Sequence, residues 1–381
     1  MDLLVIAHYQ NDGSPTAIFV HDQMRAFTKA GHRVRVIVPV AMGKRDYHGA
    51  RLSAGLQTET IDGVEHIFLR YVSLSRYGRN GFNAHCAICA LRRQLRAILV
   101  DFQPDVIHAH TLGFDSEIGA WLKEKLGCPL VVTTHGSDTS IPYEKGERDK
   151  LRVFCNRADA VVGVSSKLVA KLKDCGTQTV LQSILTGFAV ENAETVFEKK
   201  PNMWIQVGNL IAQKRVDVTI RAFAAIWRKD PEARLTIVGQ GEARPALEQL
   251  CSELGVTNAV RFTGQLPNRD VLAEMASAQF FVMPSVREGF GVVYLEAMAS
   301  GCITIGTEGE GIADLIVSGE NGFLVPPDDS DAIVKVMDWC GQHPREASGI
   351  AERGCRTAQG LTWENNAKQY IALFESMVER T

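Results

Sequence analysis

Two carboxylates, Glu288 and Glu296, flank a glycine-containing turn in the stretch SVREGFGVVYLEAMASG, which runs from Ser285 to Gly301. An apolar, strand-like run precedes the turn, and a helix-like run beginning near Val292 follows it. The free N–H groups and the positive dipole end of such a helix attract anions, above all phosphate. Carboxylates accept hydrogen bonds from sugar or ribose hydroxyls. This spacing therefore favours a ligand that joins a diphosphate to polyols, as a nucleotide sugar does.

Each of these polar residues also has a purely structural interpretation. Glu288 is then a solvated loop residue and Glu296 a helix-capping residue, and spacing alone does not separate the two interpretations. His108 and His110 end an apolar run that predicts a buried strand; structural hydrogen bonding is the favoured role for His108, whereas the role of His110 stays open. His135 follows the next predicted strand, and its pattern is compatible with either a core or a site position.

A second glycine pair, Gly239 and Gly241, lies between a predicted strand and a predicted helix, where a dinucleotide site would have its glycine-rich turn. The fingerprint of such sites requires a third glycine, but the chain has Arg244 at that position, and it lacks the expected acid about 20 residues further on. A dehydrogenase-type site is therefore disfavoured. The two glycines still allow a ligand to approach the backbone closely.

The elements that must position these residues alternate between strand and helix twice along the 381 residues. This alternation predicts an α/β protein with two doubly wound, Rossmann-like domains, residues 1–190 and 200–365, joined by the polar segment Glu191–Pro201. Ligands of open α/β sheets bind at the carboxyl ends of the strands, so we expect the two domains to face each other across a ligand-binding cleft. The predicted strands are Leu3–Ala7, Val34–Val38, Val106–His108, Leu130–Thr134, Ala160–Val164, Trp204–Val207, Leu235–Val238, Val260–Phe262, Phe280–Met283 and Ile303–Gly306.

Composition excludes several classes of protein. The net charge of −3 gives no reason to expect nucleic acid as a partner. No apolar run reaches the roughly 18 residues of a membrane span, and the first residues do not resemble a signal peptide. The nine cysteines are scattered and odd in number, which favours reduced thiols in a cytoplasmic protein. Cys86 and Cys89 have the spacing of a redox or metal site, but they lie in an apolar helical run with no second pair nearby, which favours buried thiols.

One segment of the first half is strongly basic. Between His66 and Val100 there are six arginines and no acid, and Arg92, Arg93 and Arg96 follow an apolar helical run. Such a face is typical of a helix that lies on an anionic membrane or grips a phosphate of a lipid-linked acceptor. A solvated helix face beside the cleft is an equally good interpretation of the same residues.

The Ser285–Gly301 stretch resembles the signature of the retaining glycosyltransferases of family 4, which have the two-domain GT-B fold. Further segments match that family in order and spacing along nearly the whole chain. In the second half these are VGNLIAQKRVD, LTIVGQG, VRFTGQLP and GEGIADLIVSGENGFLV. In the first half they are FQPDVIHAH, VVTTHGSD and ADAVVGVS.

The resemblance implies a role for each matching residue. Glu288 would contact the donor sugar and stabilise the reacting centre, together with His135 of the first domain. Lys214 would neutralise the diphosphate together with the amides of Gly291 and Val292. The whole expected set is catalytic Glu288 and His135; donor-binding Asn209, Lys214, Gly241, Thr263, Gly289, Phe290, Gly291, Val292 and Glu296, the last on the ribose; and acceptor-binding Gly13 and His110.

The implied activity is transfer of a hexose-type sugar from a nucleoside diphosphate, UDP by family habit, to a hydroxyl with retention and without metal or further cofactor. The implied acceptor is a glycan, a lipid-linked or a small molecule in the synthesis of surface polysaccharide or glycoconjugates. The enzyme would be cytoplasmic, with peripheral contact to the inner membrane face through the arginine segment. The last helix, residues 366–381, would pack back on the first domain.

The chain departs from the family pattern at two points. Asn209 follows Gly208, where the family commonly has an arginine, so Lys214, helped by Arg215, would carry the charge that the phosphates require. The first loop has Gly13 alone, where the family often has two glycines. Alternatives to transfer are another GT-B activity, phosphorolysis or epimerisation, or a non-catalytic nucleotide-sugar binder, which Asn209 makes plausible.

Overall fold

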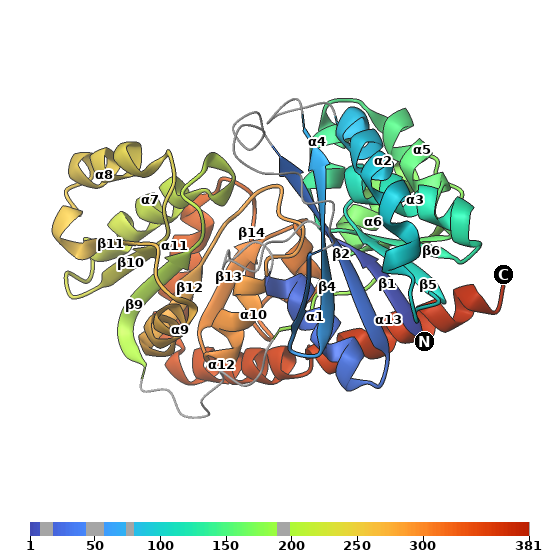
Figure 1. Cartoon of the computed structure of the whole chain (residues 1–381). Coiled ribbons are helices and arrows are strands. Elements are labelled where there is room, and N and C mark those ends of the chain that lie inside the picture. Colours follow the sequence, from blue (N-terminus) through green and yellow to red (C-terminus); the bar gives the residue numbers. More distant parts are fainter. Residues whose placement is uncertain (8–17, 43–56, 74–79, 189–198, 381) are drawn as a thin grey trace. The chain divides into compact units, whose positions relative to one another are not determined.

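The computed structural model describes residues 1–7, 18–42, 57–73, 80–188 and 199–380. Its contacts divide the chain into two units (Figure 1). Unit 1 comprises Met1–Gly187 together with Trp363–Thr381, and unit 2 comprises Phe188–Thr362. The sequence placed the domain boundaries near residues 190, 200 and 365. In the structure the chain leaves unit 1 after Gly187 and returns to it at Trp363.

The described residues of unit 1 form a sheet of eight strands in the order β3-β4-β2-β1-β5-β6-β7-β8. All neighbouring strands are parallel except β3, which pairs with β4 as an antiparallel hairpin. The direction of winding reverses between β1 and β5, so this sheet is doubly wound. The strands are β1 (Asp2–Ile6), β2 (Arg33–Met42), β3 (Gln57–Ile61), β4 (Val64–Val72), β5 (Val106–His110), β6 (Leu130–Thr134), β7 (Ala160–Gly163) and β8 (Val180–Ser183).

Helices of unit 1 connect these strands, and its last helix comes from the other end of the chain. Tyr370 of that last helix, α13, lies in hydrogen-bond contact with Thr133 of β6, at 3.0 Å between the hydroxyl oxygens. The buried amide of Gln23 in α1 donates to Asn366 of α13 at 2.7 Å. The helices are α1 (Ile18–Lys29), α2 (Asn80–Ile98), α3 (Phe114–Leu126), α4 (Ser137–Glu144), α5 (Arg148–Asn156), α6 (Ser166–Asp174) and α13 (Trp363–Val378).

The described residues of unit 2 form one sheet of six strands, all parallel, in the order β11-β10-β9-β12-β13-β14. The winding reverses between β9 and β12, which makes the loops after these two strands the expected ligand crevice. The strands are β9 (Lys200–Val207), β10 (Arg234–Val238), β11 (Val260–Gly264), β12 (Ala278–Val282), β13 (Ile303–Thr307) and β14 (Phe323–Val325). The helices are α7 (Val216–Trp227), α8 (Arg244–Glu253), α9 (Asn268–Ser277), α10 (Val292–Ala299), α11 (Ser330–Gln342) and α12 (Pro344–Gln359), with single-turn 3₁₀ helices η3 (Ala212–Lys214), η4 (Thr257–Ala259) and η5 (Gly311–Asp314).

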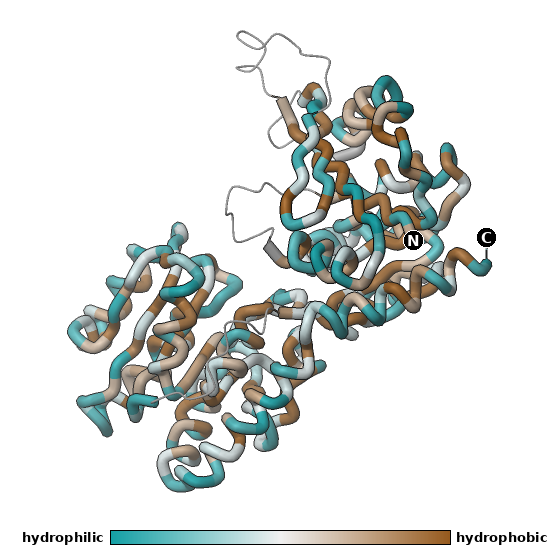
Figure 2. The backbone as a smooth tube through the Cα atoms, turned by 60° about the horizontal axis from the view of Figure 1, so that its bottom comes forward, coloured by the Kyte–Doolittle hydropathy of each residue, from teal (hydrophilic) through white to brown (hydrophobic). Residues whose placement is uncertain are grey.

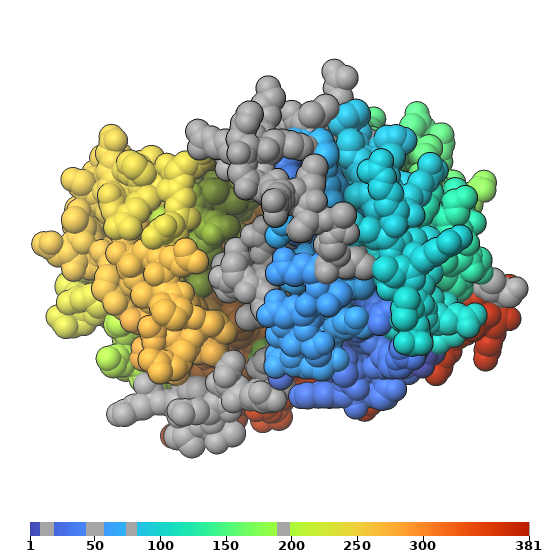
Figure 3. All heavy atoms as spheres, in the orientation of Figure 1, coloured from blue at the N-terminus to red at the C-terminus, as the bar shows by residue number. Residues whose placement is uncertain are grey.

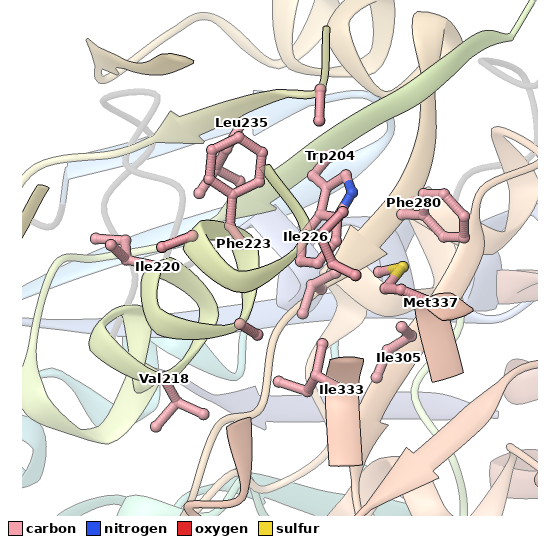
Figure 4. Packing of buried hydrophobic residues seen from close by; sticks show 14 of the residues in the cluster. Trp204, Val218, Ile220, Phe223, Ile226, Leu235, Phe280, Ile305, Ile333 and Met337 are labelled. Carbon is pink, nitrogen blue, oxygen red and sulfur yellow. The ribbon is translucent and has the colours of Figure 1, made fainter. Parts of the chain in front are cut away.

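Large apolar side chains hold each sheet to its helices, and the hydrophobic segments follow the central strands (Figure 2). In unit 2, Trp204 of β9 packs edge-on against Phe223 of α7, with ring centroids 5.5 Å apart, and tilts against Phe280 of β12 (Figure 4). All three rings are buried. Because β9 and β12 flank the point where the winding reverses, this packing fixes the strands from which the candidate site extends.

Candidate active site

Lys214 and Glu288 meet at the reversal point of the unit 2 sheet. The ammonium of Lys214, in η3 after β9, forms an ion pair with the carboxylate of Glu288, in the loop after β12. The side chains are only 18% and 20% exposed. The backbone of the lysine is fixed as well, because the side-chain amide of Gln206 donates to its carbonyl at 2.8 Å. Two residues predicted to bind one ligand therefore lie in direct contact.

A neighbouring loop holds the backbone around Glu288. The buried carboxylate of Glu310, in the loop after β13, accepts a hydrogen bond from the Glu288 amide at 2.8 Å. Gly311 packs so closely that a Cβ atom at this position would lie 2.0 Å from the carbonyl oxygen of Gly289. A larger residue at Gly311 would therefore displace the turn that carries Glu288.

The turn ends at Gly291, which precedes α10 and has a φ of 85°, a conformation that favours glycine. Phe290 is 2% exposed and anchors the turn in the core. The hydroxyl of Tyr294, in the first turn of α10, donates to the Met283 carbonyl, which ties the start of the helix to the strand edge. The first amides of α10, beginning at Val292, thus lie on a rigid support beside Glu288.

Glu296 lies one turn further along α10. Its side chain is half-buried, and its carboxylate has no hydrogen-bond or ion-pair partner among the described residues. Burial raises the pKa of the Glu296 carboxyl from 4.5 to about 7. Removing a carboxyl from water without a hydrogen-bond partner costs free energy, and hydrogen bonds from the hydroxyls of a ligand would offset this cost.

The remaining predicted donor contacts lie on the loops after β9, β10 and β11. Asn209 and Gly241 are exposed, whereas Thr263 is half-buried and donates its hydroxyl to the Gly264 carbonyl at 2.8 Å. Gly239 has a φ of 135°, and a Cβ atom there would lie 1.9 Å from the carbonyl oxygen of Gly208. The close contact between the loops after β9 and β10 therefore explains why position 239 is a glycine, and no dinucleotide site is needed to explain it.

The predicted histidines form a cluster in unit 1. His110 Nδ1 lies 3.1 Å from His135 Nε2, and the two rings are nearly parallel, with 10° between their planes. The ring of His108 lies 4.3 Å from that of His110, and His108 Nε2 lies 2.8 Å from Thr133 Oγ1. Burial, reinforced by the neighbouring imidazoles, lowers the pKa of His108 to about 3 and that of His110 well below its ordinary value. Burial also lowers the pKa of His135.

A carboxylate that the sequence analysis did not single out supports His135. Asp138, in the first turn of α4, accepts hydrogen bonds from the amides of His135 and Gly136 at 3.1 and 2.9 Å and from the hydroxyl of Thr134 at 2.9 Å. It also accepts the Leu112 amide, from the loop after β5, at 2.9 Å. Asp138 is the last residue of the HGSD segment, three residues after His135. This short spacing between an acid and a candidate histidine is the sequence signal that could have identified Asp138.

The rest of the predicted set is only partly located. Gly13 lies outside the described residues. His110 is 3% exposed and its Nδ1 contacts His135, so its contact with an acceptor stays a prediction. Arg92, Arg93 and Arg96 are exposed on α2. The part of the chain that contains α2, coloured light blue to cyan, lies at the surface in Figure 3. Among the described residues there is no cluster of three or more potential metal ligands, and no described helix is both long and apolar enough to cross a membrane.

Two family models match the chain in succession. The model "Glycosyltransferase Family 4" matches residues 16–188, and the model "Glycosyl transferases group 1" matches residues 188–354. The chain belongs to glycosyltransferase family 4. Both models describe glycosyl transfer, so membership in this family disfavours phosphorolysis, epimerisation and a purely binding role.

Curated relatives of this family 4 glycosyltransferase differ in the acceptors that their names state. The chain is 28% identical to the GDP-mannose-dependent alpha-(1-6)-phosphatidylinositol monomannoside mannosyltransferase of Mycolicibacterium smegmatis, over 63% of this chain and 72% of that protein. It is 29% identical to the N-acetyl-alpha-D-glucosaminyl L-malate synthase of Bacillus anthracis, over 86% of this chain and 87% of that protein.

Solved structures establish the fold. The chain superposes on the sucrose-phosphate synthase of Thermosynechococcus elongatus with a TM-score of 0.81 at 19% identity, covering 100% of this chain and 99% of that one. It superposes on Anabaena HepE, crystallised with UDP, with a TM-score of 0.75 at 18% identity, covering 99% and 100%. The family 4 enzyme therefore has the GT-B fold that its sequence predicted.

Proposed function

We propose that this enzyme transfers a hexose-type sugar from a nucleoside diphosphate sugar to an acceptor hydroxyl with retention of configuration. The observation that carries the proposal is the arrangement at the reversal point of the unit 2 sheet. There lie a lysine on the segment after β9, the first amides of α10, and two carboxylates, Glu288 on the loop after β12 and Glu296 one turn inside α10. A diphosphate needs the first two of these groups, and the hydroxyls of ribose and hexose need the third.

Each group has one task in the proposed donor complex. Lys214 and the amides of Gly291 and Val292 neutralise the diphosphate, and Glu296 accepts hydrogen bonds from the ribose hydroxyls. Glu288 contacts the donor sugar, and His135 supplies a further contact to it, as the family resemblance implies. The charge that develops on the leaving group is balanced by fixed donors, which is electrostatic catalysis without a metal. UDP is the proposed nucleotide, and solved neighbours with the same fold carry UDP or UDP-glucose.

In the proposed reaction the bond between the anomeric carbon and the phosphate oxygen breaks, and a bond between that carbon and the acceptor oxygen forms on the same face. The proton of the acceptor hydroxyl moves to the leaving phosphate. Release of Glu288 from Lys214 is part of donor binding in this scheme, because the diphosphate competes for the ammonium. The acceptor is a glycan, a lipid-linked molecule or a small molecule. The names of two relatives state a phosphatidylinositol monomannoside and L-malate, a lipid and a small molecule.

Helix α2 supports a peripheral contact with the inner membrane face. Its exposed side chains include Arg92, Arg93 and Arg96, together with Phe82, which is 48% exposed. The helix contains no acidic residue. A basic face with an exposed aromatic side chain is suited to anionic lipid headgroups, since the cations attract the surface and the ring inserts into it.

A thermal-shift screen of nucleoside diphosphates and their sugars tests the donor assignment. A donor at 100 times its dissociation constant adds about 2.7 kcal/mol to the free energy of unfolding. We expect a UDP-sugar to give the largest shift, followed by transfer or slow hydrolysis of the same donor. A protein that responds to none of the activated sugars contradicts the proposal.

A further inference from the structure

The contact between His110 and His135 constrains which ring nitrogen of His135 carries a proton. His110 is the last residue of β5, and His135 follows β6 directly, so adjacent parallel strands bring the two rings together. Their 3.1 Å contact joins Nδ1 of His110 to Nε2 of His135. Two neutral imidazoles in such a contact share one proton, because one nitrogen must donate and the other accept.

The surroundings favour neutral rings. Burial and neighbouring imidazoles lower the pKa of His110, and burial lowers that of His135. The groups that face the pair are the third imidazole, His108, and the carboxylates of Asp115 and Asp138, which oppose the lowering at His135. Among these, Asp138 already accepts four hydrogen bonds, none of them from an imidazole ring nitrogen.

Burial of the far nitrogen of His110 decides which ring donates. Nε2 of His110 is inaccessible to solvent and has no hydrogen-bond partner among the described residues. If His135 donated, the proton of His110 would occupy this buried nitrogen and remain without an acceptor. If His110 donates through Nδ1, the buried Nε2 is an unprotonated nitrogen instead. Orphaned buried N–H groups are rarer in proteins than unsatisfied acceptors, so the second arrangement is favoured.

We propose that His110 is a positioning residue that donates Nδ1–H to Nε2 of His135 and so holds His135 in its Nδ1–H tautomer. His135 then presents an N–H donor at Nδ1, because its hydrogen bonds to described residues use Nε2 and the backbone amide. A neutral donor suits a sugar hydroxyl oxygen. This inference rests on the proposed function for what His135 contacts, and it gives His110 a role through His135 in place of direct contact with the acceptor.

Nitrogen-15 spectra of histidine-labelled free enzyme report the tautomer without any substrate. The His135 signals are assigned by their loss in His135→Gln. We expect the wild-type enzyme to hold His135 as Nδ1–H. In His110→Leu the form with the proton on Nε2, which free imidazole prefers in water, becomes the major one. In His110→Asn the side-chain amide lies near the former Nδ1 position and restores the Nδ1–H form.

The control is His66→Asn, a substitution of another fully buried histidine, on β4 of the same unit. It leaves the His135 tautomer unchanged. If His110→Leu does not fold, the wild-type and His110→Asn spectra still decide the matter. An Nε2–H His135 in the wild-type enzyme overturns the proposal, as does a folded His110→Leu variant with an unaltered tautomer. Because the measurement needs no donor, its failure is distinct from failure of the proposed transferase function, which the thermal-shift screen detects.

Discussion

Lys214 and Glu288 form an ion pair that joins two loops 74 residues apart in sequence. Each loop extends from a strand at which the winding of the unit 2 sheet reverses. Both side chains are mostly buried, so neither charge is simply solvated. In the free enzyme the ion pair therefore fixes the two loops to each other. In our proposal Lys214 and Glu288 separate when a diphosphate sugar binds.

Substitution of Glu288 by glutamine should remove catalysis and leave nucleotide binding. The amide keeps the shape of the side chain but loses the charge that, in our proposal, stabilises the reacting centre, so we expect transfer to fall by about 10²–10³-fold. Affinity for the nucleoside diphosphate is measured by calorimetry on the same samples. Glu308→Gln, a matched change at an exposed position, should retain full activity. Undiminished turnover in Glu288→Gln would refute the role of this residue.

Substitution of Lys214 by methionine should weaken binding of nucleoside diphosphates more than binding of nucleosides. Loss of one charged contact to the phosphates predicts a rise in the dissociation constant of roughly 10- to 100-fold. Titration with UDP and with uridine separates the phosphate contribution from the rest, and Lys335→Met, at an exposed position of α11, is the control. An equal loss of affinity for both ligands would indicate damage to the loop instead of a lost phosphate contact.

The raised pKa of Glu296 predicts a pH dependence of stability in the free enzyme. The ordinary carboxyl pKa is 4.5, and burial raises it to about 7 in the folded state. At this carboxyl the folded protein therefore binds more protons than the unfolded chain between these values, so its contribution to the free energy of unfolding falls as pH rises through this window. The buried histidines, whose pKa values are lowered, contribute with the opposite sign, and the comparison with a Glu296 variant isolates the carboxyl. Glu296→Gln should flatten that decline, which denaturant titrations at about pH 5 and about pH 7.5 measure.

The same carboxyl should make uridine binding pH-dependent. Only the ionised form accepts two hydrogen bonds from ribose hydroxyls, so affinity should decrease as pH falls below about 7. We expect Glu296→Gln to bind uridine weakly at every pH. A wild-type affinity that stays constant from about pH 5.5 to about pH 8, a range that spans this pKa, would contradict the ribose contact.

The arginines of α2 should determine binding to anionic membranes. A triple change of Arg92, Arg93 and Arg96 to serine removes about 1 kcal/mol per residue of attraction to the surface. Sedimentation with phosphatidylserine-containing vesicles measures the effect, and the matched control changes three exposed arginines of unit 2, namely Arg221, Arg228 and Arg345, to serine. If the triple α2 variant partitions onto these vesicles as well as the parent, the membrane contact is wrong and α2 is a solvated surface.

Local sequence pattern sufficed for most of the framework. The apolar run before Gly289 predicted a buried strand and the run after Gly291 a helix, because periodicity and glycine positions act over a few residues. The β3–β4 hairpin was missed, although the chain contains its signal. Asp62 and Gly63 both have positive φ, as a two-residue hairpin turn requires, and an Asp-Gly pair is typical of that turn.

The sequence by itself determined the family, the two α/β units and the identity of the acids and histidines worth testing, because these depend on local pattern and on motif order. Only the tertiary structure decided which of those residues touch. It paired Lys214 with Glu288, placed Glu310 behind the Glu288 amide and stacked His110 on His135. The physical reason is that such contacts arise where separate strands of a parallel sheet end side by side. The order of strands in a sheet is set by packing of the whole unit, and no local segment encodes it.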